Sequence, residues 1–165
     1  MQLTGEQIVR NQIVTNCCSA GIQQQGLYVR LDNVFQYIGG RGFIPMEGKT
    51  ALPKYHEIDV NEENKYVLMP GYYEVEFMEG CEIPNDCAMY FKTRSSLVRC
   101  GSEIISGQFD GGFKTDKMGA FLKVEIPIII EKGARVAQMI VNETYLVEED
   151  KTYNGQWQGD KQRNS

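Results

Sequence analysis

The chain consists mostly of short apolar and β-branched runs that are separated by turn residues. Residues 27–31 and 34–38 are alternating or β-rich runs of the kind that form strands. Residues 66–69 end at Pro70-Gly71, a turn dipeptide, and residues 72–77 follow as a further strand. This rhythm predicts a chain built largely of strands.

A long segment without a strand pattern interrupts these runs, and further strands follow it. Residues 41–64 carry few periodic signals, so we expect them to form an extended connection. Residues 87–92 read as a strand, and residues 121–130 form the longest apolar run, in which Pro127 predicts an edge or a bend. A lysine-glycine turn then leads into a strand over 135–141. Repeated short strands with turns between them predict an all-β fold, a barrel or a jelly roll.

One short helix precedes the strands. Over residues 3–14, Thr4 is placed to cap a helix, and Gln7 three residues later completes a capping box. The sequence shows no internal repeat and no interdomain linker. We therefore expect one domain, a β-barrel over residues 1–147, followed by a polar tail over residues 148–165 that contains an aromatic cluster.

Composition narrows the classes of partner. The net charge is -5, which argues against broad binding to nucleic acids or anionic membranes, because there is no basic excess to displace counterions. A local basic pocket for a small anion remains compatible with this charge. No apolar run approaches the length of a membrane span, and the N-terminus lacks a signal segment. We therefore expect a cytoplasmic protein, in a cell or in an infected host.

The cysteines do not form a metal-binding pattern. They are odd in number, include an adjacent pair and show no C-x-x-C spacing, and the chain has a single histidine, His56. We expect free thiols in a reducing compartment. The five positions are Cys17, Cys18, Cys81, Cys87 and Cys100.

The stretch R-S-S-L-V-R-C-G at 94–101 carries the most suggestive chemistry. Arginine forks and serine hydroxyls are donors suited to phosphate oxygens, and a carboxylate, Asp110, follows about a dozen residues later between glycines. We expect Asp110 to meet Arg94 across one hairpin, which would place a base for water beside donors for an anion. The alternative is a surface turn whose arginines pair with some of the many acidic residues.

Four segments, in order, resemble the dCTP deaminase and dUTPase superfamily. R-S-S-L-V-R-x-G at 94–101 resembles its R-S-S-L-A-R-x-G motif, and G-x-F-D-x-G-F at 107–113 is similar to its I-D-P-G-F segment. P-I-I-I-E-K-G-A-R-V-A-Q-M-I at 127–140 resembles the closing motif, and Y-x-G-x-W-Q-G at 153–159 resembles the tail of the deaminase branch. The resemblance covers nearly the whole chain.

The resemblance implies a distorted β-barrel or jelly-roll subunit and a homotrimer with active sites where subunits meet. It also implies a deoxynucleoside triphosphate ligand carried with Mg2+, which the triphosphate would hold without direct side-chain ligands. Asp110 would stand near the sugar and, in the hydrolase branch, position the attacking water. The residues placed at the phosphates or elsewhere on the nucleotide are Arg94, Ser95, Ser96, Arg99, Gln138, Tyr153, Trp157 and Gln158. The last three belong to a tail that would fold over the ligand and exclude water.

Three departures from the family pattern bear on function. The deaminase-branch glutamate falls on Gly119 or Ala120, neither of which can transfer a proton, so deamination is not expected. Tyr28 stands where the family has an aspartate that orients magnesium, and a phenol is a poor magnesium ligand at neutral pH. The hairpin between Arg99 and Asp110, which reads the pyrimidine in the family, is short, so the sequence leaves the base undecided.

Two functions follow from these matches and departures. The first is hydrolysis of a deoxynucleoside triphosphate, dUTP foremost, to the monophosphate and pyrophosphate. The second is a protein that keeps the scaffold, has lost the chemistry, and binds or sequesters a nucleotide or a nucleotide-derived signal. An assay for pyrophosphate release separates them.

Overall fold

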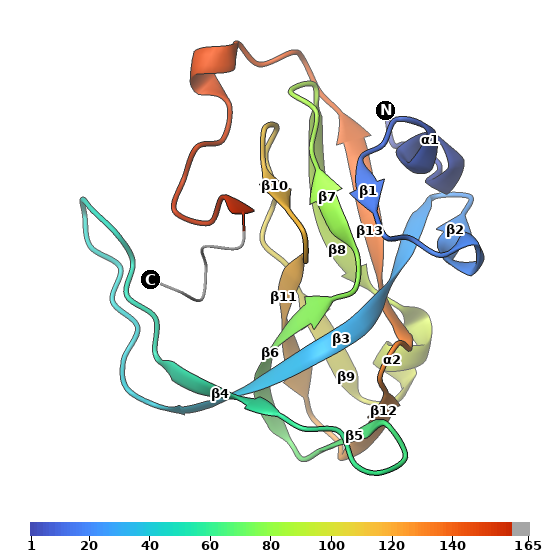
Figure 1. The fold of residues 1–165 in the computed structure, drawn as a ribbon, viewed down its shortest axis with the longest axis vertical. Helices are drawn as coiled ribbons and strands as arrows, with labels where there is room; N and C mark the ends of the chain where they lie inside the picture. Colours follow the sequence, from blue (N-terminus) through green and yellow to red (C-terminus); the bar gives the residue numbers. More distant parts are fainter. Residues whose placement is uncertain (160–165) are drawn as a thin grey trace.

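The computed structural model describes residues 1–159, which form a mainly β structure with a short helix at the N-terminus (Figure 1). The predicted β-barrel architecture is confirmed. In chain order the elements are α1 (Gly5–Arg10), β1 (Val14–Thr15), the 3-10 turn η1 (Ser19–Gly21), β2 (Ile22–Gln23), β3 (Gly26–Gly39), β4 (Lys54–Ile58), β5 (Lys65–Leu68), β6 (Gly71–Phe77), β7 (Gly80–Glu82), β8 (Cys87–Thr93), α2 (Ser95–Arg99), β9 (Ser102–Ile105), β10 (Lys114–Thr115), β11 (Gly119–Val124), β12 (Ile128–Glu131), β13 (Arg135–Glu143) and the 3-10 turn η2 (Glu149–Lys151).

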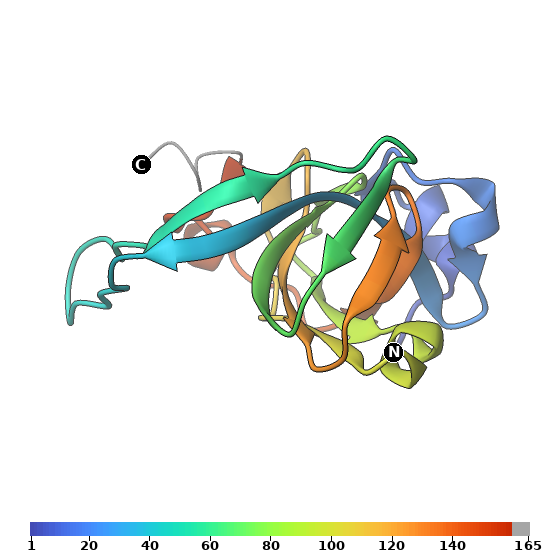
Figure 2. The same cartoon turned by 90° about the horizontal axis from the view of Figure 1, so that it is seen from below.

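The main sheet curls until its two outer strands approach each other (Figure 2). Its order is β8-β13-β3-β6-β11-β9, and β2 and β4 also pair with β3. Side-chain hydroxyls close the seam between β8 and β9. Thr93 Oγ1 accepts from Ile104 N at 2.9 Å and donates to Ile104 O at 3.1 Å, and Ser106 Oγ accepts from Phe91 N at 3.0 Å. These bonds satisfy backbone groups that would otherwise lie unpaired at a sheet edge.

The long strand β3 links the two halves of the barrel. Its first half pairs with β13 and its second half with β6 and β4, with a register shift between Leu31 and Val34. The sequence predicted two separate strands here because the polar pair Asp32-Asn33 interrupts the apolar pattern. That prediction was wrong: the pair sits at a β-bulge, which bends a strand without ending it.

Strand β4 lies inside the segment that the sequence assigned to an extended connection. It pairs with β3 from Val34 to Gly39, and Tyr55 meets Phe35 and Tyr37 edge-on. Its side chains are only partly buried or exposed, so no apolar alternation marks it. Cross-strand pairing stabilises this strand where sequence periodicity gave no signal.

The predicted capping box at Thr4 and the predicted bend at Pro127 are both present. Thr4 caps α1 by accepting from Gln7 N, and the Gln7 side chain accepts from Thr4 N, which completes the capping box. The helix ends at Arg10, earlier than the predicted residue 14, with Asn11 as its C-cap. The apolar run 121–130 is divided into β11 and β12, with the bend at Pro127 between them.

The barrel interior is a single apolar cluster. Inward-facing positions of β3, β6, β8 and β13 are almost fully buried, and each such side chain contributes roughly 1.5–3 kcal/mol relative to exposure. Representative members are Leu27, Val29, Leu31, Val75, Phe77, Met89, Met139 and Val141. No helix among the described residues is long and apolar enough to cross a membrane.

The five cysteines are free thiols. Burial raises the pKa of the Cys81 thiol to about 12 and that of the Cys87 thiol to about 11, so both stay protonated at neutral pH. Cys100, at the end of α2, is exposed.

The bulge residue Asp32 joins three elements. Its carboxylate pairs with Lys117 at 2.5 Å and with Lys132 at 3.2 Å, and its backbone carbonyl accepts from the buried Tyr66 hydroxyl at 2.6 Å. Burial alone would raise the pKa of Asp32, but hydrogen bonds from the two lysines outweigh it and hold that pKa below its usual value.

Replacing Asp32 with asparagine should therefore lower stability in a pH-dependent way. A depressed pKa contributes stability above the ordinary carboxyl value of about 3.9, and this contribution is lost as the pH falls through the folded value. Because the lysine side chains are 45% and 31% exposed, we expect a loss of only about 1–2 kcal/mol at pH 7. Denaturant unfolding of both proteins between pH 2 and 7 measures it, and the difference should vanish at the acid end.

The matched control is Glu63→Gln, which removes the carboxylate of an exposed pair with Lys65. This change should alter stability very little at any pH. An Asp32→Asn deficit that stayed constant down to pH 2 would show that charge pairing is not the cause.

Candidate functional site

A tight turn positions Asp110 beside the start of β8. Phe109 N donates to Met89 O at 2.7 Å, and Met89 N donates to Phe109 O at 2.9 Å, which fixes the turn to the strand. Gly112 has a φ of +91°, and a Cβ there would come within 2.9 Å of the Thr152 side chain. A Cβ on Gly111 would come within 3.0 Å of the backbone at Asn85. The D-G-G sequence thus places an exposed carboxylate on a turn that requires glycine.

A small pocket of about 210 Å³ opens beside this carboxylate. The Gln108 side-chain amide donates to Asp110 Oδ1 at 2.8 Å at its rim. The lining residues are Gly107, Gln108, Phe109, Asp110, Phe113, Gly119, Tyr153 and Trp157. Complete small-molecule sites usually occupy about 300–1,000 Å³, so this pocket is large enough for only part of a nucleotide-sized ligand.

The tail reaches the pocket through a continuous series of aromatic rings. Phe77, Phe91, Phe109, Phe113 and Tyr153 contact one another in that order, with centroid distances of 4.8, 5.6, 5.1 and 5.4 Å. All four contacts are edge-to-face, the arrangement that aromatic quadrupoles favour. The tail segment is thereby packed onto the barrel core instead of lying loose on the surface.

Two glutamines fasten the tail on either side of Trp157. Gln156 accepts from Thr50 N and donates to Thr50 O, both at 2.9 Å, which ties the tail to the hairpin between β3 and β4. Gln158 accepts from Lys114 N at 3.0 Å and donates to Gly112 O at 2.8 Å. The Tyr153 hydroxyl accepts from Trp157 N at 3.0 Å. In Figure 1 the tail residues up to 159 and the projecting hairpin lie on the same side of the barrel.

The arginine-serine stretch lies at the other end of β8. Arg94 is the N-cap of α2, whose backbone bonds run from Leu97 N and Val98 N to Arg94 O. Ser95, Ser96 and Arg99 are exposed on this helix. The sequence pattern predicts no helix here, because five residues with one buried side chain, Leu97, show no helical periodicity.

The side chain of Arg94 turns toward β3 and β13. Its Nη1 donates to Arg135 O at 3.1 Å, and its guanidinium carbon lies 5.0 Å from the centre of the Tyr28 ring. The Arg135 guanidinium carbon lies 6.0 Å from the same ring, and Arg135 Nη1 donates to Ala20 O at 2.6 Å. Gln138 lies opposite Tyr28 in the β3–β13 ladder, and its Nε2 donates to Gln25 O at 2.6 Å.

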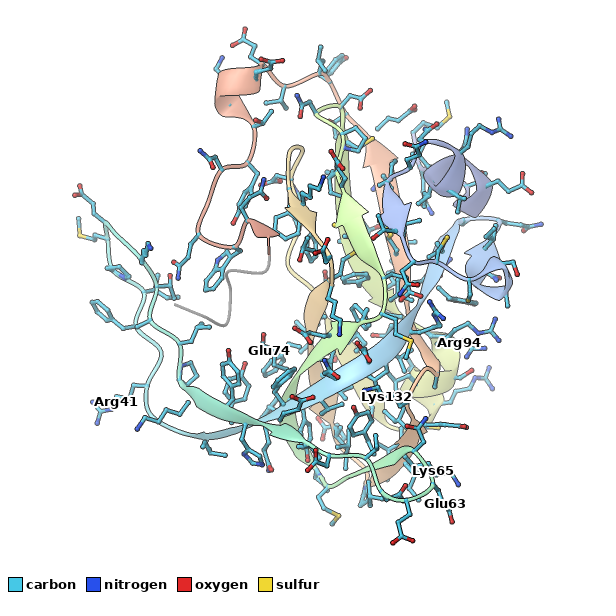
Figure 3. The ribbon with its side chains drawn as sticks, viewed as in Figure 1. Arg41, Glu63, Lys65, Glu74, Arg94 and Lys132 are labelled. Atoms are coloured by element: carbon cyan, nitrogen blue, oxygen red, sulfur yellow. The ribbon has the colours of Figure 1, made fainter. Side chains whose placement is uncertain are left out.

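The predicted site residues therefore fall into two groups within one chain. Met89 pairs with Phe109, while Arg94 lies beyond the far end of β8, at a separation of roughly 16 Å for a strand rise near 3.3 Å per residue. The expectation that Asp110 meets Arg94 across one hairpin is wrong, because the segment after α2 runs back along β8 and carries Asp110 to the start of that strand. Figure 3 shows Arg94 beside α2, on the side of the barrel away from the tail.

The described part of the chain, residues 1–159, holds no protein cage for a metal ion. Among residues 1–159, no group of three or more histidine, cysteine, aspartate or glutamate side chains is placed to hold one. Tyr28 has two guanidinium groups against its ring. Gly119 lines the pocket, and Ala120 is partly buried in β11. Neither residue has a side chain that can transfer a proton.

Sequence reasoning missed three residues that the fold brings to these groups. Gln108 and Gln156 carry no local sequence signal, because their bonds to Asp110 and Thr50 depend on the folded chain. Arg135 lies in the closing segment, and only the β3–β13 pairing brings it to Tyr28.

Comparison with known proteins agrees with this architecture. The dCTP deaminase-like family model matches residues 2–144. The chain is 34% identical over 121 residues to the deoxyuridine 5'-triphosphate nucleotidohydrolase of Methanocaldococcus jannaschii, covering 72% of this chain and 76% of the relative. It is 32% identical over 140 residues to a probable enzyme of the same name from Methanopyrus kandleri, covering 84% and 85%.

A solved structure shows the same fold. The 2'-deoxycytidine 5'-triphosphate deaminase of Agrobacterium tumefaciens superposes with a TM-score of 0.67 at 18% identity, over 91% of this chain. This chain spans half the length of that deaminase. Barrel, motif order and family match agree, and the chain belongs to the dCTP deaminase-like family.

Proposed function

We propose that this protein hydrolyses a deoxynucleoside triphosphate, dUTP foremost, to the monophosphate and pyrophosphate. The observation that carries the proposal is Asp110, an exposed carboxylate held at the rim of a pocket beneath the tail. A carboxylate in this position is suited to orient a water and take its proton. The names of the archaeal relatives support dUTP as the substrate.

The second group of residues supplies donors for the phosphates. Arg94, Ser95, Ser96 and Gln138 would contact the triphosphate, with Arg99 at the nucleotide, and Tyr153, Trp157 and Gln158 would cover it. Arginine donors at fixed positions stabilise charge that develops during phosphoryl transfer. Magnesium, which neutralises phosphate charge when bound, would be carried by the triphosphate oxygens, and we assign no step to it. Five free thiols are compatible with a cytoplasmic setting.

The division of the site suggests a homotrimer. Within one chain the pocket at Asp110 is too small for a whole nucleotide, and the phosphate donors lie beyond the other end of β8. A closed ring of identical subunits would bring the Arg94 group of one copy to the Asp110 group of its neighbour. Each ring of three copies would then hold three composite sites.

One observation favours a different function. Tyr28 replaces the family aspartate and its ring is occupied by arginines, so the scaffold could hold a nucleotide without turning it over. Sequestration of a nucleotide or a nucleotide-derived signal is therefore the second candidate. Deamination is the least supported of the three, because Gly119 and Ala120 carry no proton-transfer group.

The deciding assay incubates the purified protein with magnesium and either dUTP or dCTP. We expect pyrophosphate from dUTP and no ammonia from dCTP. Asp110→Asn should lower kcat for dUTP by about 10²–10⁴ while leaving its affinity close to that of the parent, because only the proton acceptor is lost.

The control for that variant is Asp116→Asn, an exposed aspartate beside β10 and outside both groups. It should turn over dUTP at the parent rate. Tight dUTP binding without pyrophosphate from the parent protein would reject hydrolysis and establish sequestration.

Subunit mixing tests the composite site. Arg94→Ala and Asp110→Asn proteins should each be nearly inactive, whereas co-folding them at equal ratio should restore roughly a quarter of the parent activity, because randomly mixed rings contain some sites with both native residues. Steady-state pyrophosphate release measures the recovery. No recovery from rings shown to be mixed would place both residues in a single-chain site or outside the site.

Trp157 reports on the tail because it is the only tryptophan. Titrating dUTP into the Asp110→Asn protein should change Trp157 emission as the tail closes on the ligand. Gln156→Ala should shift the ligand-free emission to longer wavelength, since the tail loses both bonds to Thr50. The exposed Gln24→Ala serves as control, and unchanged emission during calorimetrically verified binding would discard the covering role of the tail.

A further inference from the structure

We propose that Tyr28 is a positioning residue, whose ring holds the guanidinium groups of Arg94 and Arg135 together as a two-pronged clamp for a polyphosphate. This deepens the proposed function and rests on it, because it assigns the way in which the phosphate half of the site is built. It also gives Arg135 a phosphate-binding role and lets the clamp work without a metal-orienting carboxylate at position 28.

The first support is the geometry around the ring. The guanidinium carbons of Arg94 and Arg135 lie 5.0 and 6.0 Å from the ring centre, within the distance at which a cation is attracted to an aromatic face. Arginine is the cation best suited to such stacking, because its planar group keeps its hydrogen-bond donors free at the edges. The face of the Tyr28 ring is therefore in contact with the arginines and does not stack on a nucleotide base.

The second support is the electrostatic state of the two arginines. Among the residues that the structure describes, neither guanidinium forms an ion pair with a carboxylate. Their neighbour Arg30, two residues along β3 from Tyr28, is paired with the buried Glu79 at 2.7 Å. Two like charges beside one ring repel each other, and within residues 1–159 the Tyr28 ring and two backbone carbonyls are the groups that offset this repulsion. An anion with several charged oxygens would relieve it.

The third support is the way the backbone aims these side chains. The β3–β13 ladder shifts register between Arg135 and Ala137, and such a bulge redirects side chains at functional sites. Arg94 Nη1 bonds to Arg135 O, and Arg135 Nη1 bonds to Ala20 O. Each guanidinium is thus anchored through one nitrogen, which leaves the remaining donors of each fork for a ligand.

The test is calorimetric binding of inorganic tripolyphosphate in EDTA at constant ionic strength, which removes both the base and the metal from the measurement. Tyr28→Leu should raise the Kd by about 3- to 10-fold, because the ring attraction to two cations is lost. Tyr28→Phe and Tyr28→Trp should stay within about twofold of the parent, because both keep an aromatic face. Arg135→Gln should weaken binding at least as much as Tyr28→Leu.

The matched control is Tyr72→Leu, since Tyr72 is an exposed strand tyrosine whose ring stacks on Phe121. It should leave the Kd unchanged. Thermal unfolding of each variant identifies a fold defect, and the phenylalanine and tryptophan variants keep the test decisive if the leucine variant unfolds.

The outcomes separate this inference from the proposed function. If Arg94→Ala abolishes tripolyphosphate binding while all Tyr28 variants bind like the parent, the clamp is overturned and the phosphate role of Arg94 stands. If Arg94→Ala binds like the parent, the phosphate assignment fails, and the clamp fails with it. The clamp is supported if Tyr28→Leu binds tripolyphosphate more weakly than the parent while Tyr28→Phe and Tyr28→Trp bind it like the parent. This result does not depend on whether dUTP is hydrolysed.

Discussion

The length of β8 is the constraint on which the candidate site depends. This one strand carries the Asp110 turn at its beginning, through the Met89–Phe109 bridge, and Arg94 immediately after its end. An extended strand is rigid over this length, so the acid and the phosphate donors cannot meet within one chain without breaking the barrel. In the site that we propose, the two groups come from different copies, and the barrel sets the spacing between them.

Different interactions organise the residues around Asp110 and those around Arg94. Around Asp110 these are steric and aromatic contacts. Two glycines allow the turn, and ring contacts from Phe77 to Tyr153 hold the tail against the core. Around Arg94 the interaction is electrostatic, because two guanidiniums share the Tyr28 ring and neither is paired with a carboxylate of residues 1–159. The first half is suited to enclose an organic moiety, and the second to receive negative charge.

The contacts of Tyr28 explain how a tyrosine can serve at this position in place of a carboxylate. A carboxylate at that position would pair with the neighbouring arginines and oppose a phosphate, unless a metal ion intervened. The phenol ring instead holds the cations without cancelling their charge. The chain thus changes how one half of the site is organised while retaining the barrel that separates the halves.

The sequence alone determined the mainly β fold, the N-terminal capping box, the bend at Pro127 and the family, because these depend on local pattern and on ordered motifs. It misjudged β4, the continuity of β3 and the helix α2, where pairing between distant strands or a single buried leucine outweighs local periodicity. Only the tertiary structure decided that Asp110 and Arg94 lie apart, that Arg135 joins Tyr28, and that Gln156 meets Thr50. Those relations follow from strand register and bulges, since a shift of one residue turns a side chain to the opposite face of a sheet.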